Sequence, residues 1–107
     1  MNCLVSAQPY YYFALKEIYS KFGLGPEKAR LISPLKWLTD RKILVALHSD
    51  FTMAPAKPLF LMWAAVNKNT LNNEKDGKTM EGISINDAFK GITINVQWLA
   101  MTFVQQV

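Results

Sequence analysis

The chain has 107 residues, enough for one small domain at most or for a piece of a larger one. Half of the residues are hydrophobic and 19% are charged, which indicates either an oversized core or, as we favour, apolar surface that packs against something outside the chain. The net charge of +4 comes from scattered lysines and arginines that we expect on the solvated surface, and their scatter excludes the concentrated positive stripe of a nucleic-acid-binding protein.

Cys3 is the only cysteine, so neither an internal disulfide nor a cysteine metal cluster can form, and we expect its side chain to be a small buried hydrophobe. The longest apolar run, residues 59–66, is far shorter than the ~20 residues that span a bilayer. The amino terminus also lacks the pattern of a secretion signal. We therefore expect a soluble, cytoplasmic protein without membrane or nucleic-acid partners.

The first half of the chain begins with an expected strand at residues 3–7, which Pro9 ends because proline cannot continue a sheet ladder. A run of aromatic residues follows, and residues 14–22 are compatible with a helix. Glycines and a proline interrupt it, and residues 26–30 can form another short helical turn.

Ser33 and Pro34 are typical of a helix start, with the serine as N-cap and the proline at the first helical position. This helix is expected to end near residues 40–42. An apolar strand at residues 43–47 comes next. A strand, helices and a second strand form a βαβ crossover, which predicts parallel pairing of the two strands.

The second half contains an apolar helix that begins at Pro58. Its residues at i, i+3, i+4 and i+7 form an apolar stripe: Leu59, Met62, Trp63 and Val66. The other faces are apolar as well, so we expect this helix to be buried nearly all round.

Residues 67–82 are polar and are expected to form a surface loop. Ser84 followed by Asp87 resembles a capping box and predicts a helix that runs through residue 90. A last helical segment is expected from residue 93 or 94 to residue 105.

Asp50 is the candidate functional residue, because it follows the carboxyl end of a predicted parallel strand, where α/β folds place their chemistry. An Asx turn or a cap on the loop is the alternative. His48 and Asp50 are two residues apart and should face the same side, whereas Ser49 should point away. Adjacent strand residues cannot adopt the geometry of a serine hydrolase triad, so we exclude one here.

His48 is the sole histidine, and its default interpretation is a hydrogen-bonded side chain at the strand end rather than a metal ligand. No zinc or iron site can be completed within this chain, because catalytic sites usually take three or more protein ligands. Gln8 and Tyr10 follow the other strand and could line a substrate pocket or simply pack. Met53 is a further candidate for the pocket wall.

The chain carries, in this order, VSAQP at residues 5–9, ISPL at 32–35, VALHSDF at 45–51, PL at 58–59 and WAAV at 63–66. In order and spacing these segments resemble the amidohydrolase superfamily, most closely amidohydrolase family 3, whose members are metal-dependent hydrolases of carbon–nitrogen bonds. Residues 83–84, 88 and 92–95 are similar to the helices that follow the barrel in that family. The resemblance extends from residue 2 to about residue 100.

Members of this family are (β/α)₈ barrels with one or two divalent metals at the carboxyl ends of the strands. The resemblance implies that residues 3–7 are strand seven and residues 43–47 strand eight. The implied fold is α/β, a partial (β/α)₈ TIM-barrel fragment of two parallel strands with surrounding helices. Residues 1–107 would form a single partial domain, the C-terminal quarter of an amidohydrolase barrel. The family's histidines on strands one, five and six have no counterpart in this chain.

By the same resemblance, Asp50 falls on the strand-eight aspartate that ligates metal and moves the proton of the attacking water. We therefore expect a fragment of a metal-dependent amidohydrolase that hydrolyses an amide-type, non-peptide C–N bond of a small molecule with metal-activated water. Asp50 would be catalytic and metal-binding, and four residues would bind substrate: Gln8, Tyr10, His48 and Met53. The divalent metal, expected to be zinc, would be held in the full-length parent with the rest of the barrel. Neither metal binding nor activity is expected of this chain alone. The alternative is a non-catalytic barrel remnant, a small self-associating or partner-binding protein.

Overall fold

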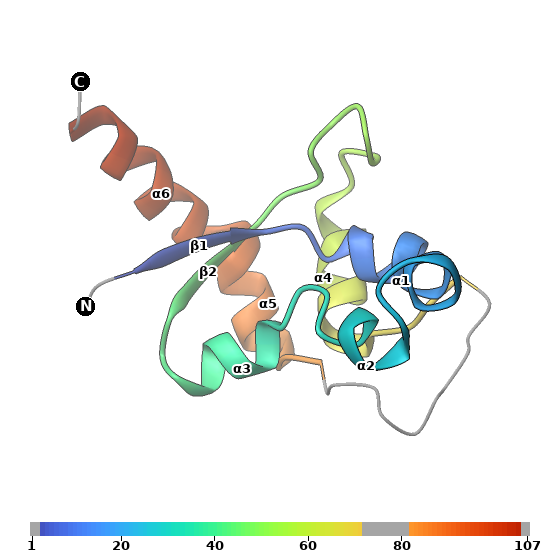
Figure 1. Cartoon of the computed structure of the whole chain (residues 1–107). Helices are drawn as coiled ribbons and strands as arrows, with labels where there is room; N and C mark the ends of the chain where they lie inside the picture. The colour runs from blue at the N-terminus through green and yellow to red at the C-terminus, as the bar shows by residue number, and fades with distance from the viewer. Residues whose placement is uncertain (1–2, 72–81, 106–107) are drawn as a thin grey trace.

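The computed structural model describes residues 3–71 and 82–105 of the chain. Its two strands pair in parallel, with Leu4 opposite Leu44 and Ala7 opposite Leu47. Figure 1 shows the elements in chain order: β1 (Leu4–Ala7), α1 (Tyr10–Phe22), α2 (Pro26–Ala29), α3 (Leu35–Asp40), β2 (Leu44–Leu47), α4 (Pro58–Asn67), α5 (Ile85–Ile92) and α6 (Ile94–Gln105). The predicted α/β class and the parallel crossover between the two strands are confirmed.

Helix α1 begins earlier than predicted, at Tyr10 rather than at residue 14. Pro9 adopts helical dihedral angles, with φ −66° and ψ −19°, so the helix starts directly after it and the aromatic run forms its first turn. The break before α2 falls where predicted. Gly25 has a φ of 78° there, a left-handed conformation that glycine adopts without steric cost.

The predicted N-cap of α3 is wrong. Ser33 has a φ of 52°, α3 begins at Leu35, and no side chain caps it. The Ser33 hydroxyl instead donates to the backbone carbonyl of Gln8 at 3.0 Å, a contact that spans 25 residues of sequence. The Ser33 hydroxyl therefore bonds a residue distant in sequence, and not the first turn of α3 as the sequence pattern suggested.

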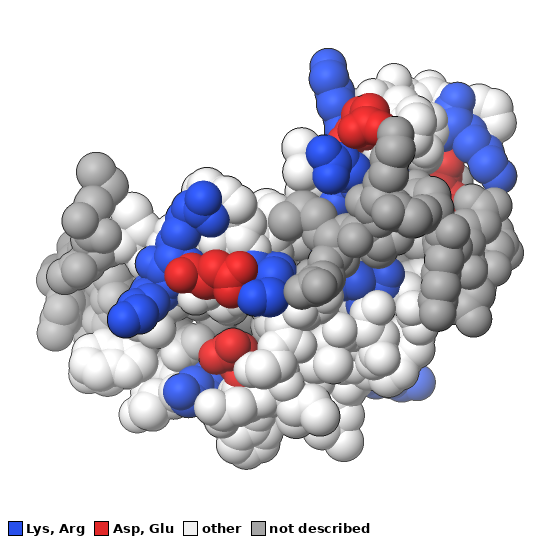
Figure 2. Space-filling model, turned by 90° about the horizontal axis from the view of Figure 1, so that it is seen from below, with Lys and Arg blue, Asp and Glu red and all other residues white. Residues whose placement is uncertain are grey.

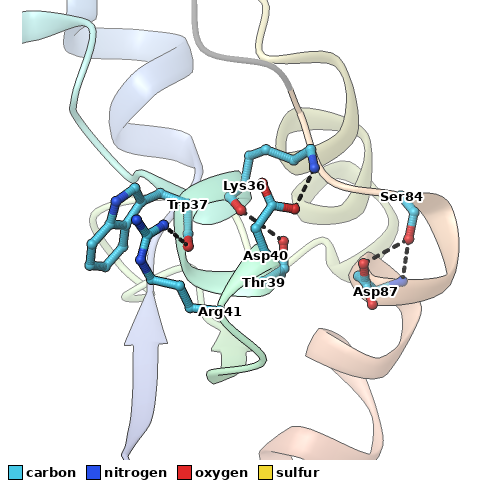
Figure 3. A network of polar contacts seen from close by, with 7 residues as sticks. All are labelled: Lys36, Trp37, Thr39, Asp40, Arg41, Ser84 and Asp87. Carbon is cyan, nitrogen blue, oxygen red and sulfur yellow. Dashed lines mark hydrogen bonds and ion pairs between the residues drawn. The ribbon is translucent and has the colours of Figure 1, made fainter.

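The outer side of α3 carries ordinary surface contacts (Figure 3). Lys36 forms an ion pair with Asp40 one turn later. The Arg41 guanidinium lies 3.9 Å from the centre of the Trp37 ring. Such contacts in a solvated position contribute little stability, so α3 is held by its buried Leu35 instead.

The predicted N-cap of α5 at Ser84 is confirmed, although Asp87 pairs with the Ser84 hydroxyl and not with its backbone N–H as in a full capping box (Figure 3). The Ser84 hydroxyl oxygen accepts from the backbone N–H of Asp87 at 3.1 Å and donates to the Asp87 carboxylate at 2.9 Å. This cap fixes the start of the helix that covers β2.

The core lies between β2, α4 and α5, and it consists mainly of aliphatic side chains: Leu35, Val45, Leu47, Ala65, Ile83 and Ala88. Helix α4 is not buried nearly all round as predicted, but on one side only, and Met62 and Val66 of the predicted stripe pack against the core as partly buried residues. Leu61, Ala64 and Ala65 are buried, whereas Leu59 is 75% and Trp63 41% exposed. The two small alanines let the α4 backbone come close to its neighbours, while Met62 and Val66 pack at the margin of the core.

Two further expectations on burial are wrong. Cys3 is exposed, because it precedes the first paired residue of β1. Lys16 and Lys68 are buried, at 2% and 4% exposure, rather than solvated. On the face drawn in Figure 2, basic side chains alternate with acidic ones and form no single positive patch. No helix within the described ranges 3–71 and 82–105 has the length and apolar character needed to cross a bilayer.

The outer edge of β2 is covered by the chain itself. The backbone N–H of His48 donates to the carbonyl of Ala7, so the backbone polar groups of residue 48 point toward β1. Those of Val45, three residues earlier, therefore point toward the opposite edge of β2. On that edge the Val45 carbonyl accepts from the side-chain amide of Asn95 at 2.9 Å, in a buried position on α6. The hydrogen bond satisfies a strand carbonyl that would otherwise be orphaned.

Gly91 allows α5 to approach this edge, and Gly91→Ala is expected to destabilise the fold. A Cβ atom there would lie 2.9 Å from Cγ of Leu47 and 3.3 Å from the Val45 carbonyl. Overpacking costs about 1–3 kcal/mol, while the better helix propensity of alanine returns about 1 kcal/mol, so a net loss of up to about 2 kcal/mol should appear in urea unfolding. Gly23→Ala is the control, because its Cβ would have 3.5 Å of clearance. Equal stabilities of the two variants would contradict the close approach.

Candidate functional site

The candidate site lies at the carboxyl end of β2, where the chain leaves the strand and runs through a loop to α4. An open hollow of about 390 Å³ is found there. Its lining comes from the strand end, the start of α4 and the junction of α5 and α6, and includes His48, Asp50, Lys57, Leu61, Ile92 and Val96. Because the amino end of α4 borders the hollow, the dipole of that helix favours negative charge in it.

Asp50 lies at the rim of this hollow in a left-handed conformation, with a φ of 49°. Aspartate tolerates this conformation better than most residues, and its backbone carbonyl accepts from the N–H of Met53 at 2.7 Å. Within the described residues, its exposed carboxylate makes neither a hydrogen bond nor an ion pair. The alternative of an Asx turn or a cap is therefore not what the structure shows, and the carboxylate is free to bind something else.

His48 is exposed and lines the same hollow as Asp50. Its backbone is fixed to β1, but its ring makes no hydrogen bond to any described residue, so the default interpretation of a hydrogen-bonded histidine is wrong. Ser49 borders the hollow as well, although we expected it to point away. The alternation of strand side chains does not extend beyond Leu47, where β2 ends.

Gln8 ties the loop after β2 to the end of β1. Its side chain is 5% exposed, and its Nε2 donates to the Ser49 carbonyl at 2.6 Å and to the Met53 sulfur at 3.4 Å. Its Oε1 is buried and has no hydrogen-bond partner among the described residues. Gln8 thus contacts Met53 within the loop, and the lining of the hollow includes neither residue.

Tyr10 belongs to a group of aromatic rings between α1 and α4. Its ring centre lies 5.7 Å from that of Phe13 and 5.8 Å from that of Phe60. Trp63 extends the group by stacking on Phe60. Of the two interpretations of the aromatic run, the structure therefore shows packing. The lining of the hollow does not include Tyr10.

Sequence reasoning missed a buried polar group centred on Lys68, at the end of α4 that is opposite to the hollow. Its ammonium nitrogen donates to the carbonyls of Ile32 at 2.9 Å and Ser33 at 2.8 Å, and it lies 3.8 Å from the centre of the Tyr12 ring. Burial lowers the pKa of Lys68 to about 7. Lys68 follows Ala64 by four residues and so lies on the buried side of α4, but the sequence does not indicate which side of this apolar helix is buried.

The described residues do not complete a metal centre. No group of three or more His, Cys, Asp or Glu side chains is found in that part of the chain. His48 and Asp50 border one hollow and could supply two ligands, whereas a catalytic metal usually takes at least three from protein. Any further ligands would have to come from outside the described residues.

A family model described as "Amidohydrolase family" matches residues 2–101, nearly the whole chain. No curated protein and no solved structure gives a significant match.

Proposed function

The chain belongs to the amidohydrolase family, and from this premise we propose that it forms the strand-seven and strand-eight part of a metal-dependent hydrolase barrel. The parallel pair β1–β2 and the helices around it support this placement, since consecutive strands of a (β/α)₈ barrel are parallel neighbours. In this proposal, residues 1–107 are one partial domain, about a quarter of the barrel, and the remaining strands come from further polypeptide.

The observation that carries the proposal is the free carboxylate of Asp50 at the carboxyl end of β2. Barrel enzymes place their catalytic groups at this end of the strands. A carboxylate that serves only the local backbone would be hydrogen-bonded to it, and that of Asp50 has no such bond within the described ranges. A non-glycine residue at a φ of 49° also stores strain, which is frequent at functional sites.

The proposed reaction is hydrolysis of an amide-type, non-peptide C–N bond in a small molecule. A divalent metal, for which we propose zinc, supplies an activated water when bound, and the rest of the barrel supplies most of its ligands. Asp50 would contribute one ligand, and its carboxylate would accept a proton from the attacking water and pass it to the leaving nitrogen. His48 contacts substrate in the hollow, whereas Gln8, Tyr10 and Met53 lie outside its lining and stay weaker candidates for the pocket wall of the complete barrel. A cytoplasmic location is proposed with this function.

The proposal is tested on the protein that contains this chain in its source cells. We expect that protein to hold zinc and to hydrolyse at least one member of a panel of N-acyl amino acids and cyclic amides. The isolated 107-residue chain is expected to do neither, because Asp50 and His48 are too few ligands. Stoichiometric zinc and turnover by the isolated chain would contradict this assignment.

A second candidate function is that of a non-catalytic barrel remnant that associates with itself or with a partner. Asn95 favours it, because its hydrogen bond to Val45 occupies the β2 edge where a further barrel strand would pair. Helix α6 favours it too, since it projects from the rest of the molecule (Figure 1), has no charged residue, and exposes Trp98 and Val104. Sedimentation velocity tests it: a chain that stays monomeric at high concentration and captures no partner would exclude this function.

A further inference from the structure

Lys68 ends helix α4 in a position that is unusual for a lysine. It is 4% exposed and has a φ of 50°, and its backbone N–H donates to the Ala64 carbonyl at 3.1 Å. Lys68 is absent from the lining of the hollow, and its side-chain nitrogen donates to two successive backbone carbonyls of the segment before α3, those of Ile32 and Ser33. Burial of an amine is unfavourable unless its hydrogen bonds are made, so these two contacts are what keeps Lys68 inside.

The segment that Lys68 holds is a tight turn. Ser33 has a φ of 52°, a conformation that costs a residue with a Cβ roughly 1–2 kcal/mol. A turn of this kind persists only when its surroundings fix it. Lys68 fixes it from one side through the carbonyls, and the Ser33 hydroxyl fixes it from the other by donating to the carbonyl of Gln8 at 3.0 Å.

From Gln8 the contacts continue into the loop with Asp50. The Gln8 side chain donates to the carbonyl of Ser49, the residue before Asp50, at 2.6 Å. It also donates to the sulfur of Met53, three residues after Asp50, at 3.4 Å. Three hydrogen bonds in succession therefore connect Lys68 to the residue next to the free carboxylate. They join the end of α4 to the carboxyl ends of both strands.

We propose that Lys68 is a positioning residue, which holds the Asp50 loop in place through the turn at Ser33 and the side chain of Gln8. That a fixed loop would serve catalysis rests on the proposed function, in which Asp50 binds a metal and acts on a substrate. The positioning itself does not depend on catalysis, because it can be measured on the chain without substrate or metal. The positioning role of Lys68 and the proposed function can therefore be contradicted by separate experiments.

The test measures amide hydrogen exchange by NMR in Lys68→Met, which keeps a long, unbranched side chain, one atom shorter than lysine, but removes its donors. The N–H of Met53 reports on the loop, since it bonds the Asp50 carbonyl, and the N–H of Ala88 in α5 is the reference. We expect exchange at Met53 to increase about tenfold, the factor for loss of one hydrogen bond, with little change at Ala88. Lys28→Met, on the exposed surface of α2, is the matched control and should change neither.

Ser33→Gly tests the link independently should Lys68→Met fail to fold. Glycine accepts the φ of 52° without strain, so this change removes the side chain with its hydroxyl and does not disturb the backbone conformation. Lys42→Gly is its control, because Lys42 has a similar φ of 57° but is exposed and outside the chain of contacts. We expect faster exchange at Met53 in Ser33→Gly and not in Lys42→Gly. Unchanged exchange at Met53 in Ser33→Gly, or a uniform increase across the fold in Lys68→Met, would overturn the proposal.

Discussion

Under the proposed function, Asp50→Asn is expected to lower kcat/KM for amide hydrolysis by about 10²–10⁴-fold in the complete barrel, the range typical for loss of a general acid–base group. The amide cannot accept a proton from water or return it to the leaving nitrogen, and it is a weaker metal ligand than a carboxylate. Folding should be almost unaffected, because the carboxylate makes no hydrogen bond or ion pair with any described residue and asparagine also tolerates the φ of 49°. Steady-state kinetics and thermal unfolding of the same preparation check the two halves of this expectation.

Asp40→Asn is the matched control for this substitution. Asp40 is an exposed aspartate of α3 that pairs with Lys36 and is absent from the lining of the hollow, so its loss should leave kcat/KM unchanged. An Asp50→Asn enzyme that keeps its full activity would show that the carboxylate moves no proton. A large loss of folding stability would instead show that Asp50 is a structural residue, contrary to its lack of partners.

The parts of the fold that were predictable are those fixed by local chemistry. Pro9 ends a strand whatever surrounds it, and Ser84 with Asp87 forms its cap from atoms three residues apart. The parallel pairing followed from the order of the elements alone. The location of Asp50 at a strand end was predictable for the same reason.

What could not be predicted depends on contacts that are distant in sequence. Ser33 has the features of an N-cap, yet its hydroxyl bonds Gln8 across 25 residues. Helix α4 is apolar on every face, so hydrophobic periodicity could not decide which side is buried. The buried side is the one with Ala64 and Ala65, whose small size permits close packing, and Lys68 lies on the same side and is buried with them.

The pH dependence of stability is expected to reveal the buried amine of Lys68. Burial lowers its pKa from the ordinary value of 10.5 to about 7, although the Tyr12 ring and the two carbonyls favour the charged form. Between these pH values the unfolded chain binds a proton at Lys68 that the folded chain lacks. The free energy of unfolding should therefore rise with pH from about 7 upward, by up to about 1.4 kcal/mol per pH unit. Below pH 7 both states are protonated, and this contribution is constant at its least favourable value.

Urea unfolding of the wild type and of Lys68→Met between about pH 7 and about pH 9 isolates this contribution, since most other groups titrate equally in both proteins. The wild type should gain stability relative to Lys68→Met as the pH rises, whereas Lys28→Met should follow the wild type throughout. Loss of the charge does not break the contacts to Ile32 and Ser33, because a neutral amine keeps two N–H groups for two carbonyls. The Asp50 loop should accordingly stay in place across this range while the stability changes. A difference between wild type and Lys68→Met that is independent of pH would mean that Lys68 keeps its charge in the interior.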